Sequence, residues 1–231
     1  MDKPIIFCFP HAGGGAHQYL SWQNMLPQDI TWRAVDRAGR YSRTSEQTQD
    51  SFEHLVQDLV EQLLPDIHKA PFALFGHSMG GALAFEVTKE LEMKGLYPKC
   101  LFISSAVSPL DRDKDEIRFF ELEDQLFLDH ILGGRDEVNR AVLQIFLQDI
   151  RDEYKQYHQY SPDRDSVLET PIVALCGEDE PINVTMDNWQ NFTRKFHGVF
   201  QFPGSHFYWK ENLVEVAALI SNQMKLKGYY A

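Results

Sequence analysis

Short apolar runs alternate with segments of helical periodicity along most of the chain. The apolar runs predict β-strands at residues 5–9, 32–35, 72–75, 101–104, 172–176 and 199–202. Apolar residues from Phe52 to Leu64 recur at helical spacing and predict an amphipathic helix that ends near Pro65. Further helices are expected at residues 19–26, 82–93, 188–196 and 213–224. Strands that alternate with helices predict an α/β fold with a mostly parallel sheet covered on both faces.

One long segment interrupts this alternation. About 65 residues separate the fourth predicted strand from the fifth, far more than a crossover connection needs. The segment has helical patterns of its own, with Phe120, Phe127 and Ile131 on one face and a second face at Leu143, Leu147, Ile150, Tyr154 and Tyr157. We interpret residues 107–168 as a helical lid subdomain inserted over the carboxyl edge of the sheet. The alternative is plain helical packing on the outer face of the sheet.

Composition favours a single soluble globular domain. The chain has 231 residues, of which 43% are apolar and 24% are charged, so disordered, collagen-like and coiled-coil classes are excluded. The net charge of −12 excludes a nucleic-acid-binding surface and disfavours adhesion to anionic membranes. The longest apolar runs are about six residues, too short for a membrane span or a signal-peptide core. We expect a cytoplasmic protein without membrane contact.

The cysteines and histidines give no sign of a metal site. Cys8, Cys100 and Cys176 are odd in number, form no CxxC pair and lie in apolar runs, so we interpret them as buried thiols. The sequence contains no HExxH motif. We therefore expect no metal site.

The sequence Gly76-His77-Ser78-Met79-Gly80 matches the G-x-S-x-G pattern, which is weak by itself. Here an apolar run leads in and a helix-favouring run leads out, as at a nucleophile elbow. A sharp turn between strand and helix exposes the serine hydroxyl, and the glycines allow neighbouring backbone to approach. Ser78 is therefore the candidate nucleophile, and it needs a base within hydrogen-bonding reach.

Hydrolases with this elbow follow the chain order serine, acid, histidine, so the base is expected late in the sequence. His206 follows the last predicted strand and is our candidate base, whereas His197 is interpreted as a helix-terminal residue. The acid is expected in the turn after residues 172–176. Counting from Gly177 favours Glu180, and Asp179 is the alternative.

The oxyanion of an acyl-transfer reaction is usually held by two backbone N–H groups. One follows the nucleophile, at Met79, and the other is expected in the glycine-rich loop after the first strand, at Ala12. The competing interpretation of this loop is a phosphate-binding loop. It lacks the Gly-Lys-Ser/Thr ending and the G-x-G-x-x-G spacing of such loops.

Three segments in this order resemble type II thioesterases, the stand-alone editing enzymes of nonribosomal peptide and polyketide assembly lines. The segments are Phe9-Pro10-His11-Ala12-Gly13-Gly14, Phe75-Gly76-His77-Ser78-Met79-Gly80-Gly81 and Phe202-Pro203-Gly204-Ser205-His206-Phe207. The stretches Gln125-Leu126-Phe127-Leu128, Leu132-Gly133-Gly134 and Asp152-Glu153-Tyr154 resemble the lid region of that family. The resemblance implies an α/β-hydrolase fold with a helical lid. It also implies hydrolysis, without a cofactor, of aberrant or stalled acyl groups from the phosphopantetheine thiol of acyl- and peptidyl-carrier proteins.

The chain also departs from the family pattern. Ala38-Gly39-Arg40-Tyr41 stands where the family often has Pro-Gly-Arg-Glu, and the usual Asp–Asp pair at the acid turn is Asp179-Glu180. Two alternatives to the carrier-protein thioesterase remain open, namely a small-molecule carboxylesterase with the same triad and a non-catalytic carrier-binding module. Because carrier proteins are usually acidic near their attachment serine, we also expect a local basic or apolar docking patch that includes Arg40 and Arg43.

Overall fold

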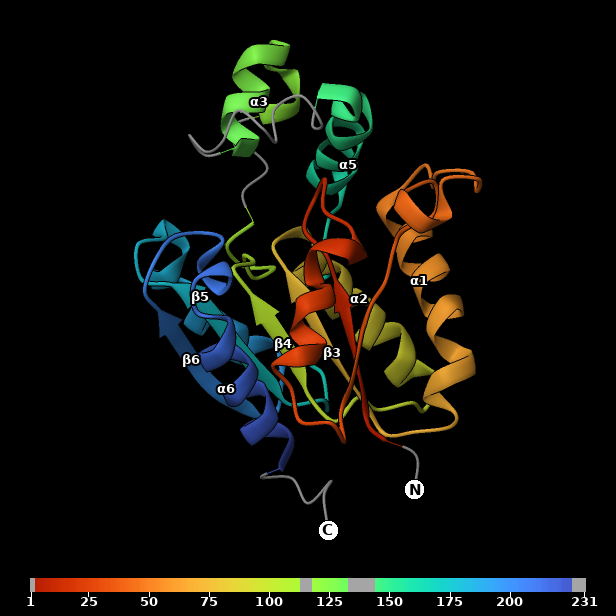
Figure 1. Cartoon of the computed structure of the whole chain (residues 1–231), viewed down its shortest axis with the longest axis vertical. Helices are drawn as coiled ribbons and strands as arrows, with labels where there is room; N and C mark the ends of the chain where they lie inside the picture. Colours follow the sequence, from red (N-terminus) through yellow and green to blue (C-terminus); the bar gives the residue numbers. More distant parts are fainter. Residues whose placement is uncertain (1–2, 113–117, 133–143, 226–231) are drawn as a thin grey trace.

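A single parallel sheet organises the computed structural model, which describes residues 3–112, 118–132 and 144–225. Its strand order is β2-β1-β3-β4-β5-β6, and every neighbouring pair is parallel. The strands are β1 (Ile5–Phe9), β2 (Thr31–Ala34), β3 (Phe72–His77), β4 (Leu101–Ser104), β5 (Ile172–Gly177) and β6 (Phe196–Phe202). Because all strands run in one direction, the loops that follow them meet at one edge of the sheet (Figure 1).

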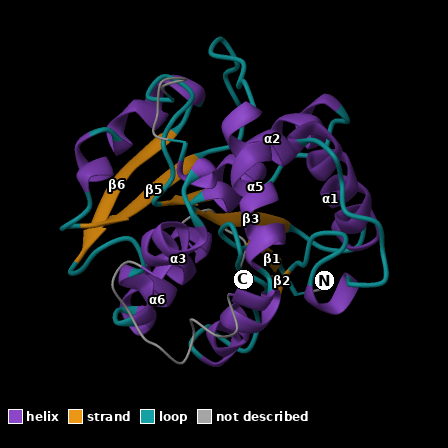
Figure 2. Ribbon diagram, turned by 90° about the horizontal axis from the view of Figure 1, so that it is seen from above, coloured by secondary structure: helices purple, strands orange, loops and turns teal. Residues whose placement is uncertain are grey.

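Helices cover both faces of the sheet, as Figure 2 shows from above. Helices α1 (Phe52–Ile67) and α2 (Met79–Met93) share a buried cluster with one face, and α6 (Leu213–Lys225) shares a second cluster with the other. Every residue of β3 and β5 is buried, which explains why these strands are continuous apolar runs. The α/β prediction is confirmed. Pro65 lies inside α1 rather than at its end.

An aromatic cluster anchors two irregular segments on the α6 side of the sheet. One segment is the 3₁₀ helix η1 (Ala16–Asn24), and the other is η6 (Tyr208–Lys210) after β6. The rings of Tyr19 and Trp209 stack with centroids 4.8 Å apart, and those of Trp22 and Trp32 stack at 4.6 Å. The cluster therefore fixes the chain that follows the glycine-rich loop and the chain just after His206.

The helix predicted at residues 188–196 is confirmed only in its first part, which lies in the 3₁₀ helix η5 (Met186–Phe192). Strand β6 begins at Phe196, so the interpretation of His197 as a helix-terminal residue is wrong, and His197 lies in a strand. Gly198 has a φ of 96°, and the pairing of β6 with β5 shifts register beside it. This irregularity breaks the alternation by which a strand is normally recognised.

The segment between β4 and β5 contains helices α3 (Asp124–Leu132) and α5 (Leu147–Gln159), preceded by the short 3₁₀ turn η3 (Phe119–Glu121). Both helices lie beyond the carboxyl ends of the strands (Figure 1). They bury a small cluster of Phe127, Leu128, Leu147 and Ile150, and Tyr154 packs against both this cluster and the main core. Leu143 and Gly133-Gly134, which entered the sequence argument, lie outside the described residues.

Candidate functional site

Ser78 lies at the junction of β3 and α2 with a φ of 56° and a ψ of −125°, backbone angles that are sterically unfavourable for a serine. Its N–H donates to the Ser104 carbonyl at 2.8 Å. The turn closes because two glycines allow direct backbone contact. A Cβ on Gly76 would lie 2.1 Å from the Gly80 oxygen, and one on Gly80 would lie 2.0 Å from the Phe9 oxygen.

The loops after β5 and β6 bring His206 and Glu180 together. Nδ1 of His206 lies 2.6 Å from Oε1 of Glu180, whose side chain is buried. Oε2 of the same carboxylate accepts from Ser105 Oγ at 2.5 Å and from the Gly177 N–H at 3.0 Å. Both carboxylate oxygens of Glu180 therefore contact hydrogen-bonding groups. Asp179, the alternative acid, has an exposed side chain, and its amide donates to the Gly204 carbonyl at 3.0 Å.

The environment of Glu180 favours its ionised form. Burial acts to raise the pKa of this carboxyl, but the hydrogen bond and the charge of His206, together with the bonds from Ser105 and Gly177, outweigh burial and lower the pKa. A carboxylate that stays ionised can hold the imidazole of His206 in one orientation and stabilise its protonated form.

Two further histidines surround His206. The ring of His77 lies 4.8 Å from the ring of His206, and the ring of His11 lies 5.8 Å from that of His77. Burial, and next the positive charge that His206 can carry, lower the pKa of both His77 and His11. His77 also bonds through Nδ1 to Ser104 Oγ, which lies 2.8 Å from the Tyr208 hydroxyl. His77 is fully buried, His11 is half-buried, and 40% of the side-chain surface of His206 is accessible.

The glycine-rich loop after β1 packs against the start of α2, because a Cβ on Gly80 would also lie 2.7 Å from the Pro10 oxygen. Ala12 is buried within this loop, and Met79 is the first residue of α2. The loop that contains Ala12 therefore lies against the first turn of α2, where Met79 is located. Among the described residues, Ser78 Oγ and His206 make no hydrogen bond with each other, which is common in catalytic groups before substrate binds.

Arg37 is a residue of this site for which the sequence predicted only a polar loop. Its guanidinium is buried and donates to the carbonyls of Pro10 at 3.1 Å, His11 at 3.3 Å and Gly14 at 3.1 Å. It also bonds to Glu153 of α5 through Nε at 3.0 Å. The neighbouring residues Val35 and Ala38 could have pointed to burial at this position, but nothing in the sequence identifies the carbonyls that Arg37 binds.

The predicted basic patch at Arg40 and Arg43 is wrong. Arg40 is only 4% exposed and pairs with Asp149 at 3.1 Å and Glu153 at 3.5 Å. Arg43 pairs with Glu46 at 2.5 Å and with Asp58 at 2.6 Å. The positive charges of both arginines are therefore used within the fold.

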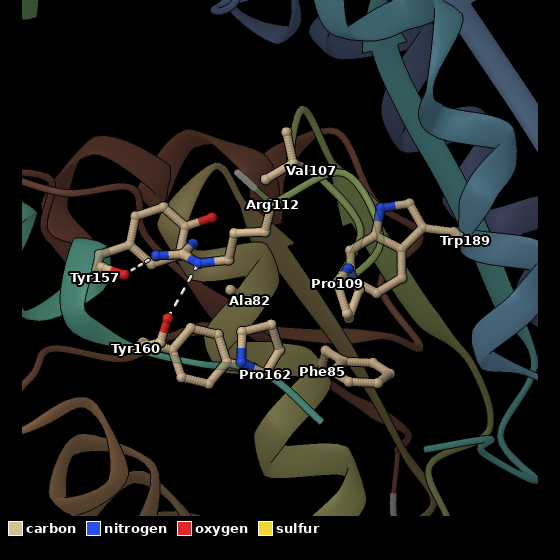
Figure 3. A pocket seen from close by; sticks show the side chains of 9 residues that line it. All are labelled: Ala82, Phe85, Val107, Pro109, Arg112, Tyr157, Tyr160, Pro162 and Trp189. Atoms are coloured by element: carbon tan, nitrogen blue, oxygen red, sulfur yellow. Dashed lines mark hydrogen bonds between the residues drawn. The ribbon is translucent and has the colours of Figure 1, made fainter. Parts of the chain in front are cut away.

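A small cavity of about 10 Å³ lies beside the first turns of α2 (Figure 3). Its walls come from α2, the loop after β4, the end of α5 and η5, and they include Ala82, Phe85, Val107, Tyr160 and Trp189. Arg112 also lines the pocket, but its guanidinium binds the carbonyls of Tyr157 and Tyr160. The remaining lining is apolar and aromatic, and the cavity between these side chains has room for about one water molecule.

The part of the chain that the structure describes contains no cluster of three or more His, Cys, Asp or Glu side chains able to hold a metal ion. All three cysteines are buried. No described helix combines the length and the apolar character needed to cross a membrane.

Comparison with known proteins identifies the family. The thioesterase domain model matches residues 4–224, nearly the whole chain. The chain belongs to the thioesterase family. This thioesterase is 28% identical to the gramicidin S biosynthesis protein GrsT of Aneurinibacillus migulanus, over 97% of this chain and 90% of that protein. It is 29% identical to the thioesterase PikA5 of Streptomyces venezuelae, over 95% of this chain and 80% of that protein.

Solved structures agree with this assignment. The thioesterase superposes on ClbQ of the colibactin pathway with a TM-score of 0.87 and 29% identity, over 97% of this chain and 98% of that one. It superposes on the type II thioesterase BorB of the borrelidin cluster with a TM-score of 0.84 and 28% identity, over 96% and 91% of the two chains. The predicted α/β-hydrolase fold and the resemblance to type II thioesterases of polyketide and nonribosomal peptide pathways are confirmed.

Proposed function

We propose that this thioesterase hydrolyses aberrant or stalled acyl thioesters on the phosphopantetheine arm of acyl- and peptidyl-carrier proteins in polyketide or nonribosomal peptide biosynthesis. Ser78 is the nucleophile, His206 the general base and Glu180 the acid that orients His206. The observation that supports this proposal most strongly is the bond of 2.6 Å between His206 and a buried Glu180, beside the elbow that presents Ser78. We also propose that the enzyme acts in the cytoplasm.

In the first step, His206 Nε2 removes the proton of the Ser78 hydroxyl while Oγ attacks the thioester carbonyl carbon. The carbonyl oxygen becomes an oxyanion, which the N–H groups of Met79 and Ala12 stabilise. The tetrahedral intermediate then collapses and the carbon–sulfur bond breaks. The pantetheine sulfur takes the proton from His206 and leaves as the thiol, so His206 is neutral again. An acyl group now remains as an ester on Ser78.

In the second step, His206 removes a proton from water, and the resulting hydroxide attacks the acyl ester. The same amides hold the second oxyanion, the bond to Ser78 Oγ breaks, and His206 returns the proton to Ser78. The products are the free acid and the carrier protein with its thiol restored. Glu180 stays ionised throughout because its pKa is lowered. The carboxylate can therefore stabilise the protonated form of His206.

Two features are consistent with an acyl substrate carried by another protein. The small apolar cavity begins at Ala82, one helical turn beyond Ser78, and its aromatic walls would have to separate to admit an acyl chain attached at the elbow. Residues 107–168, which include α3 and α5, form part of the same single domain and act in this proposal as a lid through which the pantetheine arm enters.

The experiment is a panel of acyl groups presented both on carrier proteins and as matched oxygen esters. We expect hydrolysis of the carrier thioesters, a preference for them over oxygen esters, and a loss of about 10⁴-fold or more in Ser78→Ala. A strong preference for oxygen esters would instead identify a small-molecule carboxylesterase. Unchanged hydrolysis in Ser78→Ala would contradict the serine mechanism, and carrier binding without hydrolysis would identify a binding module.

The two adjacent acids provide a matched pair of variants. We expect Glu180→Gln to lower kcat/KM far more than Asp179→Asn, since only Glu180 contacts His206 in the structure while Asp179 faces solvent. Both changes remove one negative charge from the same turn, so a general charge effect would lower both equally. The reverse ranking would transfer the role of the acid to Asp179.

A further inference from the structure

Helix α5 reaches the glycine-rich loop through a buried carboxylate. Glu153 is only 7% exposed, and its Oε2 accepts from the Gly13 N–H at 2.6 Å. Its other oxygen, Oε1, receives Arg37 Nη2 at 2.9 Å. A residue 140 positions away in the sequence therefore binds the backbone immediately next to Ala12, the proposed oxyanion donor.

Arg37 extends this contact to the rest of the loop. Because its guanidinium binds the carbonyls of Pro10, His11 and Gly14 on one side and Glu153 on the other, it connects the whole loop to α5. Planar guanidinium groups are suited to such roles since they hold several donors in a fixed arrangement.

Packing supports the same connection. Gly13 has a φ of 74°, and a Cβ placed there would lie 3.1 Å from the side chain of Ile150, one turn before Glu153 on α5. The helix therefore lies directly on the loop. A fully buried apolar contact and a buried ion pair both join the same two segments.

We propose that Glu153 and Arg37 are positioning residues that couple the docking of α5 to the geometry of the oxyanion loop. With α5 in place, Gly13 and the carbonyls around Ala12 are fixed, so the Ala12 N–H is aimed at the developing oxyanion. If Glu153 is lost, the Gly13 N–H and Arg37 lose their buried partner and the loop relaxes. This inference rests on the proposed function, because it requires an oxyanion at Ala12.

Such coupling has a definite kinetic signature. A donor that acts only on the oxyanion changes the stability of the transition state and leaves substrate binding unaffected. Loss of one oxyanion donor lowers kcat by roughly 10²–10³-fold in other hydrolases. A displaced donor loses part of that factor, so we expect a fall of about 10–100-fold in kcat with KM changed by less than about twofold.

The alternative is that Glu153 only holds α5 in place as structure. In that case Glu153→Gln would lower the stability of the protein or raise KM, with kcat of the folded fraction unchanged. The affinity for a trifluoromethyl ketone analogue of the substrate separates the two cases, because its adduct with Ser78 carries an oxyanion. If the inhibition constant of the ketone rises in Glu153→Gln by the same factor by which kcat falls, the substitution acts on the oxyanion site.

We would compare Glu153→Gln with the matched control Asp152→Asn, which neutralises the adjacent carboxylate on α5. Asp152 is exposed and bonds to Gln148 at 3.0 Å, so we expect unchanged kcat, KM and inhibition. The measurements are kcat and KM on one acyl-carrier thioester, the inhibition constant of the trifluoromethyl ketone, and thermal unfolding. The pH dependence of kcat/KM should keep its shape, because His206 and Glu180 are untouched.

Should Glu153→Gln fail to fold, Glu153→Asp keeps the charge for Arg37 but withdraws the carboxylate from Gly13, and the same fall in kcat is expected. Wild-type kcat and inhibition in a folded Glu153 variant would overturn the inference. If Ser78→Ala also kept full activity, the proposed function itself would fail. Loss of activity in Ser78→Ala with none in the Glu153 variants would reject only the coupling.

Discussion

Ser105 shows how one residue supports the acid of the site. It has a φ of 46°, in the left-handed region that disfavours residues with a Cβ, and it is almost fully buried. Its hydroxyl donates to Glu180 Oε2 at 2.5 Å. A non-glycine residue in this conformation costs about 1–2 kcal/mol, so a compensating role at the site is expected. We interpret the strained backbone as the means by which the end of β4 directs a hydroxyl at Glu180.

The variant Ser105→Gly tests this interpretation because it relieves the backbone strain and removes the hydroxyl together. We expect its free energy of unfolding to change by less than about 1 kcal/mol, since relief of strain offsets the lost bond. The value of kcat/KM should nevertheless fall by about tenfold, as a hydrogen bond to a charged group contributes about 1.5–3 kcal/mol. Urea unfolding and steady-state kinetics measure the two quantities.

Ser105→Ala is the control, because it removes the hydroxyl but keeps the strained Cβ. It should lose both stability and kcat/KM. Full activity in the glycine variant would show that the hydroxyl does not position Glu180. In either variant the pKa of Glu180 should rise, since the bond from Ser105 is one of the interactions that lower it.

Residues of this site differ in how far the sequence predicts them. Ser78 and His206 are recognisable because the elbow motif and the chain order constrain them, and counting from Gly177 favoured Glu180, which the structure brings against His206. Ser105, Arg37 and Glu153 were not found. Their contacts join segments that are distant in the sequence, and no local pattern encodes such pairings.

At the scale of elements, the junction of β3 and α2 depends on the absence of side chains at two glycines. We expect Gly76→Ala and Gly80→Ala each to prevent folding of the junction, because each Cβ would lie about 2 Å from backbone oxygen that cannot move aside. Expression as soluble protein and a cooperative thermal transition are the measurements. Gly95→Ala is the matched control at the other end of α2.

The control variant Gly95→Ala is expected to lose less stability than the other two variants. Gly95 has a φ of 75°, but a Cβ there would meet nothing within 4 Å, so only the unfavourable backbone conformation remains. We expect Gly95→Ala to fold with a loss of about 1–2 kcal/mol. Losses at Gly76 and Gly80 no larger than the loss at Gly95 would mean that the backbone at the junction can move to accommodate the added methyl groups.

The strands were predicted better than the connections between them. Fully buried strands such as β3 and β5 are continuous apolar runs, and such runs are visible without any tertiary information. The irregular pairing near Gly198 concealed the start of β6, and the 3₁₀ helices η1 and η5 have no strong periodic signature. As a result, the observed helices and strands begin and end at other residues than predicted, but they follow one another in the predicted order.

At the scale of the whole molecule, the parallel sheet brings the ends of β1, β3 and β6 to one edge and packs three histidines there. His77 is fully buried, His11 and His206 are partly exposed, and the pKa values of His11 and His77 are lowered. The neutral ring of His77 against His206, with the neutral ring of His11 behind it, allows a single positive charge to form in this cluster during catalysis. The same arrangement makes the stability of the fold depend on pH.

The sign of this dependence follows from proton linkage. A histidine whose pKa is lower in the folded state than in the unfolded state binds protons preferentially when unfolded. The stabilising effect of the neutral rings is therefore complete above the unfolded pKa of about 6.5 and is lost as pH falls from there toward the lowered folded pKa. One such histidine contributes up to about 1.4 kcal/mol per pH unit to this slope.

We accordingly expect the free energy of unfolding of the wild type to fall between about pH 6.5 and pH 5.5, and His11→Gln to reduce this slope by up to one proton. Urea unfolding at several pH values measures the slopes. His68→Gln is the control, since His68 is exposed and its loss should leave the slope unchanged. An identical slope in the wild type and His11→Gln would mean that burial of His11 does not keep its ring neutral, and the protonation of His206 would then compete with that of its neighbour.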